Sequence, residues 1–134
     1  MGMALRISSC VIALIQQAAA EAAPLEACGL LFGSDGVERA SVAANVADDP
    51  ARRFEIDPAA LIAALRAERA GGERVIGYWH SHPSGDATPS ATDAAVAAAD
   101  GKIWIIVAGE ALTAWRAGRR GLHARFEPVA FDLG

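Results

Sequence analysis

Segments typical of buried strands alternate along the chain with segments typical of amphipathic helices, and this order is the feature that most restricts the fold. The runs Cys28–Gly33 and Lys102–Ala108 are almost continuously apolar, as expected of strands that are covered on both faces. Between them, Asp57-Pro58 provides an N-cap and a first-turn proline for a helix that Gly71-Gly72 stops. The alternation predicts an α/β fold, a single layered domain with a mixed β-sheet flanked by helices, and leaves the strand order open. The apolar positions of the helix are Leu61, Ile62 and Leu65.

Turn residues and caps delimit the remaining elements. Gly33-Ser34-Asp35-Gly36 has the chemistry of a hairpin turn, and the glycines and arginines of Ala117–Gly121 predict a second turn between antiparallel strands near the end. The other predicted strands are Ala4–Ser8, Val37–Val46 and Arg74–His80. The other predicted helices run from a cap at Ser8 or Ser9 to about Ala23, before Pro24, and from Ser90 to Ala99.

Length and composition restrict the class of protein. The 134 residues fit one domain spanning residues 1–134, since no repeat, linker or low-complexity segment divides them. A formal net charge of −4 offers no generalised basic surface, so no nucleic-acid partner is expected. Cys10 and Cys28 are too few for a disulfide framework and are interpreted as buried thiols. The apolar stretch Ile7–Ala23 is interrupted by Gln16 and Gln17 and is too short to span a bilayer, so the expectation is a cytoplasmic protein without a membrane partner.

Two histidines separated by one residue lie at the end of the predicted strand Arg74–His80. In an extended chain the side chains of His80 and His82 project from the same face, roughly 6.5 Å apart at the backbone, so two imidazoles can converge on one ion. Asp93 follows His82 by eleven residues, after a loop whose turn residues can fold back toward the strand. Zinc accepts imidazole nitrogen and carboxylate oxygen, and a catalytic zinc has three protein ligands and a water. These residues therefore predict a His₂-carboxylate zinc site.

Each part of this pattern also has a purely structural interpretation. A lone H-x-H is more often a pair of surface or hydrogen-bonded histidines, and Ser90-Ala91-Thr92-Asp93 is a good helix capping box. Glu26, on the turn between a helix and a strand, fits an ordinary surface carboxylate. The joint spacing is more specific, because H-S-H-x₇-S-x₂-D occurs together with P-x-E-x-C-G-x-L-x-G at Pro24–Gly33.

The joint pattern resembles the JAMM (MPN-plus) metalloprotease family. The resemblance extends from about Leu5 to Trp115, and Phe54–Pro58 and Val75–Pro83 are also similar to the compact bacterial members. It is complete at five positions: Glu26, His80, His82, Ser90 and Asp93. The resemblance implies a fold similar to the cytidine-deaminase type, a curved sheet with helices against it and zinc at one edge.

The resemblance also implies a role for each of these residues. His80, His82 and Asp93 would hold one Zn²⁺ per chain together with a catalytic water, whose pKa zinc lowers toward about 7. Glu26 would take the proton of that water and deliver it to the departing amine. Ser90 would donate a hydrogen bond to the oxyanion of the tetrahedral intermediate.

Members of this family hydrolyse peptide or isopeptide bonds after the C-terminal glycine of ubiquitin-like proteins. The expected partner is therefore a ubiquitin-like or sulfur-carrier protein, and the leaving group is cysteine or another amine. An extended glycine-ended tail is expected to pair with a sheet edge beside the zinc. The oligomeric state is left open.

Two alternatives remain beside this hypothesis. The segment His82–Asp86 also resembles the loop of RadC-type proteins, which have a DNA-related role, although Ser81 stands where those proteins favour Asn. A non-catalytic scaffold of the MPN-minus type is the second alternative, against which the intact set of five residues argues. His123 is interpreted as structural or surface-exposed, and the three tryptophans as core or groove walls.

Overall fold

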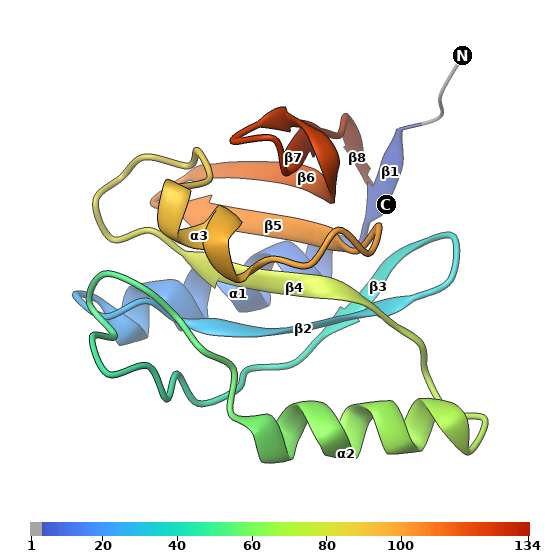
Figure 1. Cartoon of the computed structure of the whole chain (residues 1–134). Coiled ribbons are helices and arrows are strands. Elements are labelled where there is room, and N and C mark those ends of the chain that lie inside the picture. Colours follow the sequence, from blue (N-terminus) through green and yellow to red (C-terminus); the bar gives the residue numbers. More distant parts are fainter. Residues whose placement is uncertain (1–3) are drawn as a thin grey trace.

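The computed structural model describes residues 4–134, which form one curled mixed sheet of eight strands with helices on both faces (Figure 1). The strand order is β7-β6-β5-β4-β2-β3-β1-β8. The strands are β1 Leu5–Ile7, β2 Cys28–Gly33, β3 Gly36–Ala40, β4 Val75–Ser81, β5 Ile103–Ala108, β6 Ala111–Leu122, β7 Phe126–Pro128 and β8 Phe131–Leu133. The helices are α1 Ser9–Ala22, α2 Pro58–Arg69 and α3 Ala91–Val96. The predicted α/β class and mixed sheet are confirmed.

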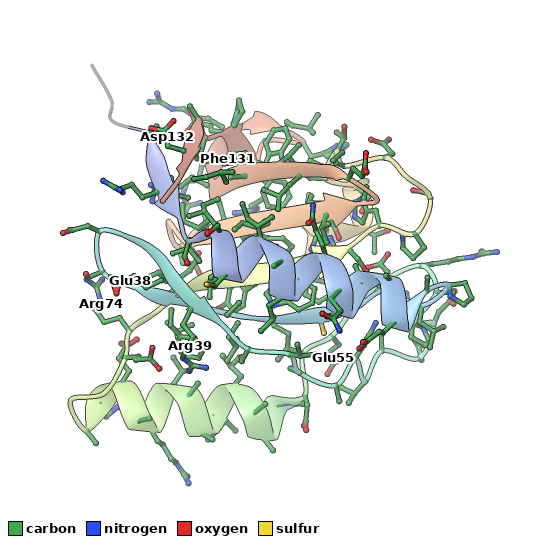
Figure 2. The ribbon with its side chains drawn as sticks, turned by 180° about the vertical axis from the view of Figure 1, so that it is seen from behind. Glu38, Arg39, Glu55, Arg74, Phe131 and Asp132 are labelled. Atoms are coloured by element: carbon green, nitrogen blue, oxygen red, sulfur yellow. The ribbon has the colours of Figure 1, made fainter. Side chains whose placement is uncertain are left out.

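Helix α1 covers one face of the sheet, as Figure 2 shows from behind. Its side chains Val11 and Ile15 are buried against Leu31, Trp79 and Ile105 of the central strands. Burying an aliphatic side chain of this size contributes about 1.5–3 kcal/mol, so this contact fixes the helix to the sheet. The helix begins directly after its N-cap, Ser8, and ends at Ala22, two residues before Pro24. Both ends agree with the expectation from the flanking serine and proline.

The opposite face carries two smaller apolar clusters. Under α3, Trp104 packs against Phe126 and Ala97, and under α2, Leu30 and Phe32 pack against Val75. Helix α2 begins at the predicted Asp57-Pro58 cap, but Ile62 and Leu65 remain 49% and 37% exposed, because the helix lies at the margin of the sheet (Figure 1).

Strand β4 is central, since β2 pairs with it antiparallel on one side and β5 parallel on the other. Its carboxyl end carries His80, which is paired with Cys28 of β2 and Ile106 of β5. The connection from β4 to β5 passes through α3 (Figure 1). Sites in α/β sheets form beyond such carboxyl ends, where loops and helix starts converge. Strand β4 itself offers no free edge for pairing, because β2 and β5 occupy both of its sides.

A glycine beside the central strand allows a close backbone approach. A Cβ atom added at Gly29 would lie 1.8 Å from the carbonyl oxygen of Ser41 and 2.4 Å from Nε1 of Trp79. The Trp79 indole N–H donates to that same carbonyl at 2.8 Å. The glycine of the E-x-C-G motif is therefore required for the hydrogen bond that fixes the buried tryptophan behind His80.

Three predicted boundaries are wrong. The strand expected over Val37–Val46 ends at Ala40, because residues 41–46 leave the ladder and keep only isolated bridges. The helix expected over Ser90–Ala99 ends at Val96. The turn expected at Ala117–Gly121 is a bulge within β6, where the register to β7 shifts and Gly121 takes φ +78°. Glycine accommodates a bulge as readily as a turn, so the glycines of this segment do not distinguish the two structures.

The expectation of two buried thiols is half wrong. Cys28 is buried, but Cys10 is exposed, because it lies in the first turn of α1 away from the buried Val11 and Ile15. Among the residues that the structure describes, no helix has the length and apolar character needed to cross a membrane.

Candidate metal centre

The structure brings the two histidines and Asp93 together at the carboxyl end of β4. The Nε2 atoms of His80 and His82 lie 3.0 Å apart. The carboxylate of Asp93, in the first turn of α3, reaches both rings, with Oδ1 3.2 Å from Nε2 of His80 and Oδ2 3.1 Å from Nε2 of His82. All three residues are buried, so these contacts form in a site shielded from water.

The separations and the chemistry of this donor set fit a zinc ion. Two ligand atoms of a tetrahedral zinc at about 2.0–2.2 Å lie about 3.3–3.6 Å from one another. The observed separations of 3.0–3.2 Å are only slightly shorter, so small movements of the side chains would complete the site. Two imidazoles and a carboxylate are a ligand set that catalytic zinc uses, and it keeps one position for another ligand.

The ring of His82 is oriented by a backbone carbonyl. Its Nδ1 lies 2.7 Å from the carbonyl oxygen of Asp86, which can only accept, so Nδ1 carries the proton. In the neutral ring Nε2 then presents a lone pair toward His80 and Asp93. Carbonyl or carboxylate partners of this kind are typical for histidines that bind metals, because they fix the tautomer and the ring orientation.

Burial determines the charge state of His80, and hydrogen bonding determines the charge state of Asp93. Desolvation lowers the pKa of His80, more than the neighbouring Asp93 raises it, so the ring is neutral. Burial alone would raise the pKa of Asp93, but the hydrogen bonds with His80 and His82 outweigh it and hold this pKa well below its usual range. A neutral imidazole beside an ionised carboxylate is the form in which both bind a cation.

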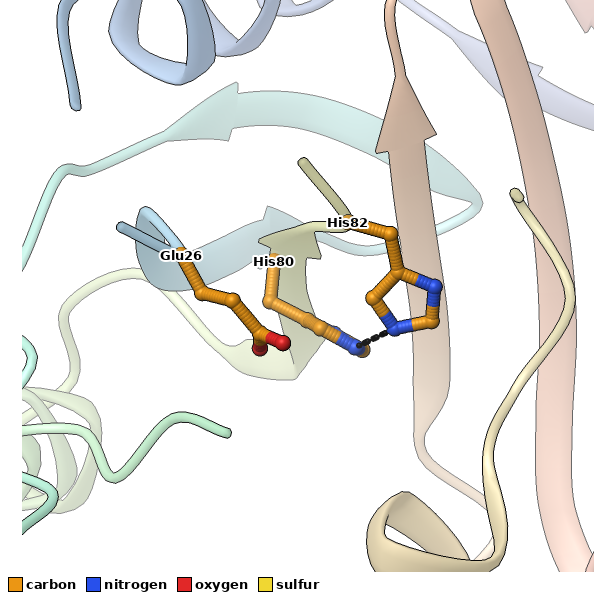
Figure 3. A group of neighbouring side chains, drawn as sticks. All are labelled: Glu26, His80 and His82. Atoms are coloured by element: carbon orange, nitrogen blue, oxygen red, sulfur yellow. Dashed lines mark hydrogen bonds between the residues drawn. The ribbon is translucent and has the colours of Figure 1, made fainter. Parts of the chain in front are cut away.

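Glu26 points at the same location from the segment between α1 and β2 (Figure 3). Its carboxylate and the ring nitrogens of His80 and His82 offer ligand atoms within 4.8 Å of one another. Glu26 is 6% exposed, and within residues 4–134 its buried Oε1 has no hydrogen-bond partner. Asp93 lies closer than Glu26 to both histidines, so Asp93 is the carboxylate better placed to coordinate an ion. Glu26 is better placed to contact a molecule bound beside that ion.

The environment of Glu26 shifts the pKa of its carboxyl group toward neutrality. Burial raises its pKa from 4.5 to about 7, while His82 acts to lower this pKa and Asp93 to raise it. A carboxyl group with a pKa near neutrality can both accept and return a proton at pH 7. The surface-carboxylate interpretation of Glu26 is therefore wrong.

Ser90 caps α3 and keeps its hydroxyl proton available. Its Oγ accepts a hydrogen bond from the backbone amide of Asp93 at 3.0 Å, and the Ser90 amide donates to Oδ2 of Asp93 at 3.0 Å. The predicted capping box is therefore present. Since Oγ acts as an acceptor in this pair, the hydroxyl can still donate to another group.

A groove leads away from the centre on the α2 and α3 side of the sheet. It has a volume of about 400 Å³ and lies between residues 47–56 and the end of α3. Phe54 stacks on His80 with 4.2 Å between ring centroids, and Trp104 meets the same imidazole edge-on at 5.6 Å. These two aromatic rings form the wall shared by the groove and the metal centre, as expected for one of the tryptophans.

The sequence did not identify several residues that build the site. Phe54 stacks on His80 and Asp86 contacts His82 through its backbone carbonyl, so neither contact uses a side chain that binds metals. The only available signal was the similarity of Phe54–Pro58 to compact bacterial members of the family. His123 lies outside the ligand set. Its Nε2 donates to the carbonyl oxygen of Pro89 at 3.2 Å, which is a structural contact.

Comparison with known proteins identifies the family. Residues 8–119 match the family described as prokaryotic homologs of the JAB domain. A desampylase of Haloferax volcanii is 33% identical over 99 residues, which are 72% of this chain and 71% of that protein. A probable TtuB-protein conjugate cleaving protease of Thermus thermophilus is 41% identical over 71 residues, 53% of this chain and 48% of that protein.

Solved structures share the fold. A protein of Desulfitobacterium hafniense superposes with a TM-score of 0.81 and 25% identity, covering 97% of this chain and 92% of that one. A structure described as a JAMM metalloprotease-like zinc site in the proteasome and signalosome has a TM-score of 0.62 and 21% identity, over 98% and 99% of the two chains. The resemblance inferred from the motif is confirmed, and the chain belongs to the prokaryotic JAB family.

Proposed function

We propose that the chain is a zinc-dependent isopeptidase that cleaves the bond after the C-terminal glycine of a ubiquitin-like or sulfur-carrier protein. The observation that carries this proposal is the position of Glu26. Its buried carboxylate, with one oxygen unpartnered, points at the place where His80, His82 and Asp93 converge. A purely structural cluster would have no use for a fourth, unpaired acidic group, because burying it without a partner is costly.

Each residue of the site has a distinct part in the reaction. His80, His82 and Asp93 would hold the zinc, which would supply Lewis-acid activation of water by lowering its pKa toward about 7. Glu26 accepts a proton from the attacking water, because its pKa near 7 leaves a large ionised fraction at neutral pH. It then gives that proton to the departing nitrogen, so the amine leaves in a neutral form. The hydroxyl of Ser90 donates to the carbonyl oxygen as that oxygen gains negative charge.

The groove beside Phe54 fits the tail of the substrate. Its lining is mainly apolar, and it runs from the exposed Val96 at the end of α3 to the aromatic wall at His80. An extended tail lying there would end at Phe54 and Trp104, the two aromatic rings that pack on His80. Ala47, Asp48 and residues 53–56 line one side of the groove, so a tail bound there would lie against this loop.

The two relatives support the choice of substrate. One is described as a desampylase and the other as a protease that cleaves a TtuB-protein conjugate. The second match spans about half of that relative, so its support is limited to that half. The RadC-like and scaffold alternatives are not favoured, because both of these relatives are described as enzymes that act on conjugates or as a desampylase.

We also propose the cytoplasm as the compartment of this enzyme. Cys10 is an exposed free thiol, and Cys28 is a buried one without a disulfide partner. Free thiols of this kind are maintained in reducing compartments.

The proposal is tested with the zinc-loaded protein and a panel of conjugates. Carrier proteins ending in Gly-Gly are joined through that glycine to lysine, to cysteine or to a fluorescent amine, and release of the amine is followed. Wild type should cleave at least one class, and Glu26→Gln should bind zinc normally but lose cleavage by about 10²-fold or more. Wild type that cleaves none of them, with one zinc per chain verified by mass spectrometry, would contradict the proposal.

A further inference from the structure

Asn45 has the most extensively hydrogen-bonded side chain near the candidate site. Its Nδ2 donates to the carbonyl oxygens of Glu26 at 2.9 Å and Arg53 at 3.1 Å, with a longer contact to Pro50 at 3.5 Å. Its Oδ1 accepts from the backbone amides of Ala47 at 3.1 Å and Glu55 at 3.0 Å. One half-buried side chain therefore closes residues 45–55 into a loop and ties that loop to Glu26.

The backbone of Glu26 is bound to this loop on both sides. Its carbonyl accepts from Asn45, and its amide donates to the carbonyl of Pro50 at 2.8 Å. Glu26 precedes β2 and lies outside its regular ladder. Ala27, the next residue, is bonded to Ser81 at the end of β4, so the sheet fixes one side of Glu26. The position of the Glu26 backbone itself, and with it the direction of the carboxylate, depends on the loop through its own amide and carbonyl.

The same loop also reaches the histidines and the groove. Phe54, next to the Arg53 carbonyl that Asn45 holds, stacks on His80 at 4.2 Å. Ala47, Asp48 and residues 53–56 line one side of the groove. The loop thus contacts the general base, a metal ligand and the space assigned to the substrate tail.

We propose that Asn45 is a positioning residue that fixes Glu26 relative to the substrate groove. The inference rests on the proposed function for the roles of Glu26 and the groove. Its N–H donors hold the Glu26 carbonyl and the Arg53 carbonyl at a fixed separation, while its oxygen keeps the loop closed. The loop and the Glu26 carboxylate are therefore parts of one rigid unit. A substrate tail bound against the loop would have a fixed position relative to this carboxylate.

Two substitutions distinguish the role of the Asn45 N–H donors from the role of its acceptor oxygen. Asn45→Asp has nearly the same shape and retains an oxygen that can accept from Ala47 and Glu55, but loses both N–H donors. Asn45→Ala loses donors and acceptor together. Lys102→Met is the matched control, because it removes a side-chain hydrogen bond to the carbonyl of Val75 at 2.7 Å, at the opposite end of β4.

Amide hydrogen exchange provides a readout that needs no substrate. In Asn45→Asp the amide of Glu26 should exchange at least tenfold faster, while the amides of Ala47 and Glu55 stay protected. In Asn45→Ala all three should exchange faster, and in Lys102→Met none should change. Unchanged protection of the Glu26 amide in both Asn45 variants would overturn the inference, whether or not the protein cleaves any conjugate.

Kinetics then distinguish positioning from folding. If wild type cleaves a conjugate, Asn45→Asp should lower kcat about tenfold or more with KM changed less than threefold, since the loop stays closed and only Glu26 is released. Asn45→Ala should lower kcat and also raise KM, because the side of the groove loosens. Both should still bind one zinc. A fall in zinc content matching the fall in kcat, or an unchanged kcat, would overturn the positioning role.

Discussion

Ser90 and Asp93 hold each other through two reciprocal hydrogen bonds, each 3.0 Å long, at the start of α3. The Asp93 carboxylate that accepts from the Ser90 amide is the same group that reaches both histidines. Helix capping and assembly of the metal centre are therefore not competing explanations of this motif. The cap fixes the rotamer of the carboxylate before any ion binds, which reduces the ordering that binding requires.

Replacing Ser90 by alanine should impair turnover while leaving zinc bound. The variant loses one donor to the developing oxyanion, which is expected to cost about 10²–10³ in kcat. It also loses one cap acceptor, worth about 1 kcal/mol of folding stability. Ser90→Thr keeps a hydroxyl and should retain both functions in large part. Kinetics and thermal denaturation of the two variants check this, and an alanine variant with wild-type kcat would remove Ser90 from the catalytic set.

Replacing Asp93 by asparagine should release the metal without unfolding the helix. The amide oxygen can still accept from the Ser90 amide, but the neutral group no longer offers a carboxylate to zinc. His80→Ala should lose the metal in the same way. Zinc per chain, measured after gel filtration against a metal buffer, should fall well below one in both variants. Retention of stoichiometric zinc by Asp93→Asn would show that another group, such as Glu26, is the third ligand.

Thr113 provides a test of how the loop between the ligands is held. Its hydroxyl donates to the carbonyl of Ala87 at 2.6 Å and accepts from the indole N–H of Trp115 at 2.8 Å. Ala87 follows Asp86, whose carbonyl orients His82. Thr113→Val should therefore weaken zinc binding by up to about tenfold, the worth of one hydrogen bond of about 0.5–1.5 kcal/mol, while Thr113→Ser should not. Competition with a chromophoric chelator measures this, and equal affinities for the Val and Ser variants would contradict it.

Elements with local signals could be predicted from the sequence. The Asp57-Pro58 cap, the apolar run of β2 and the capping box at Ser90 depend on residues that lie next to one another, so their structures follow from adjacent side chains. The convergence of His80, His82 and Asp93 could be predicted from their joint spacing. Each part of the pattern has a common structural use, so only the combination was specific.

Residues whose role is to hold backbone atoms could not be predicted. Asn45 contacts the Glu26 carbonyl from nineteen positions away, and any residue type could supply that carbonyl. Phe54 stacks on His80 only because a loop and a central strand meet in the folded chain. The bulge in β6 was mistaken for a turn because glycine signals a change in backbone direction without specifying which one.

The two cysteines should differ in reactivity. Cys10 is exposed, whereas Cys28 is buried, and burial together with the nearby Glu26 raises its pKa to about 12. Thiolate is the reactive form, so an aromatic disulfide reagent at pH 8 should modify one thiol per native chain and both after denaturation. Cys10→Ser should show none in the native state. Rapid modification of native Cys10→Ser would mean that the strand carrying Cys28 opens readily.

The pKa of Glu26 predicts how the stability of the metal-free protein depends on pH. Because the folded pKa of about 7 lies above the unfolded value of 4.5, the folded state binds more protons between these values, and the free energy of unfolding falls as pH rises through this range. Glu26→Gln cannot ionise and should lack this fall. Urea denaturation in the presence of a chelator should therefore show Glu26→Gln gaining on wild type by about 1–3 kcal/mol between pH 5 and pH 8. Groups that do not interact with Glu26 cancel in this difference, and parallel profiles would show that Glu26 titrates near its ordinary pKa and is not desolvated.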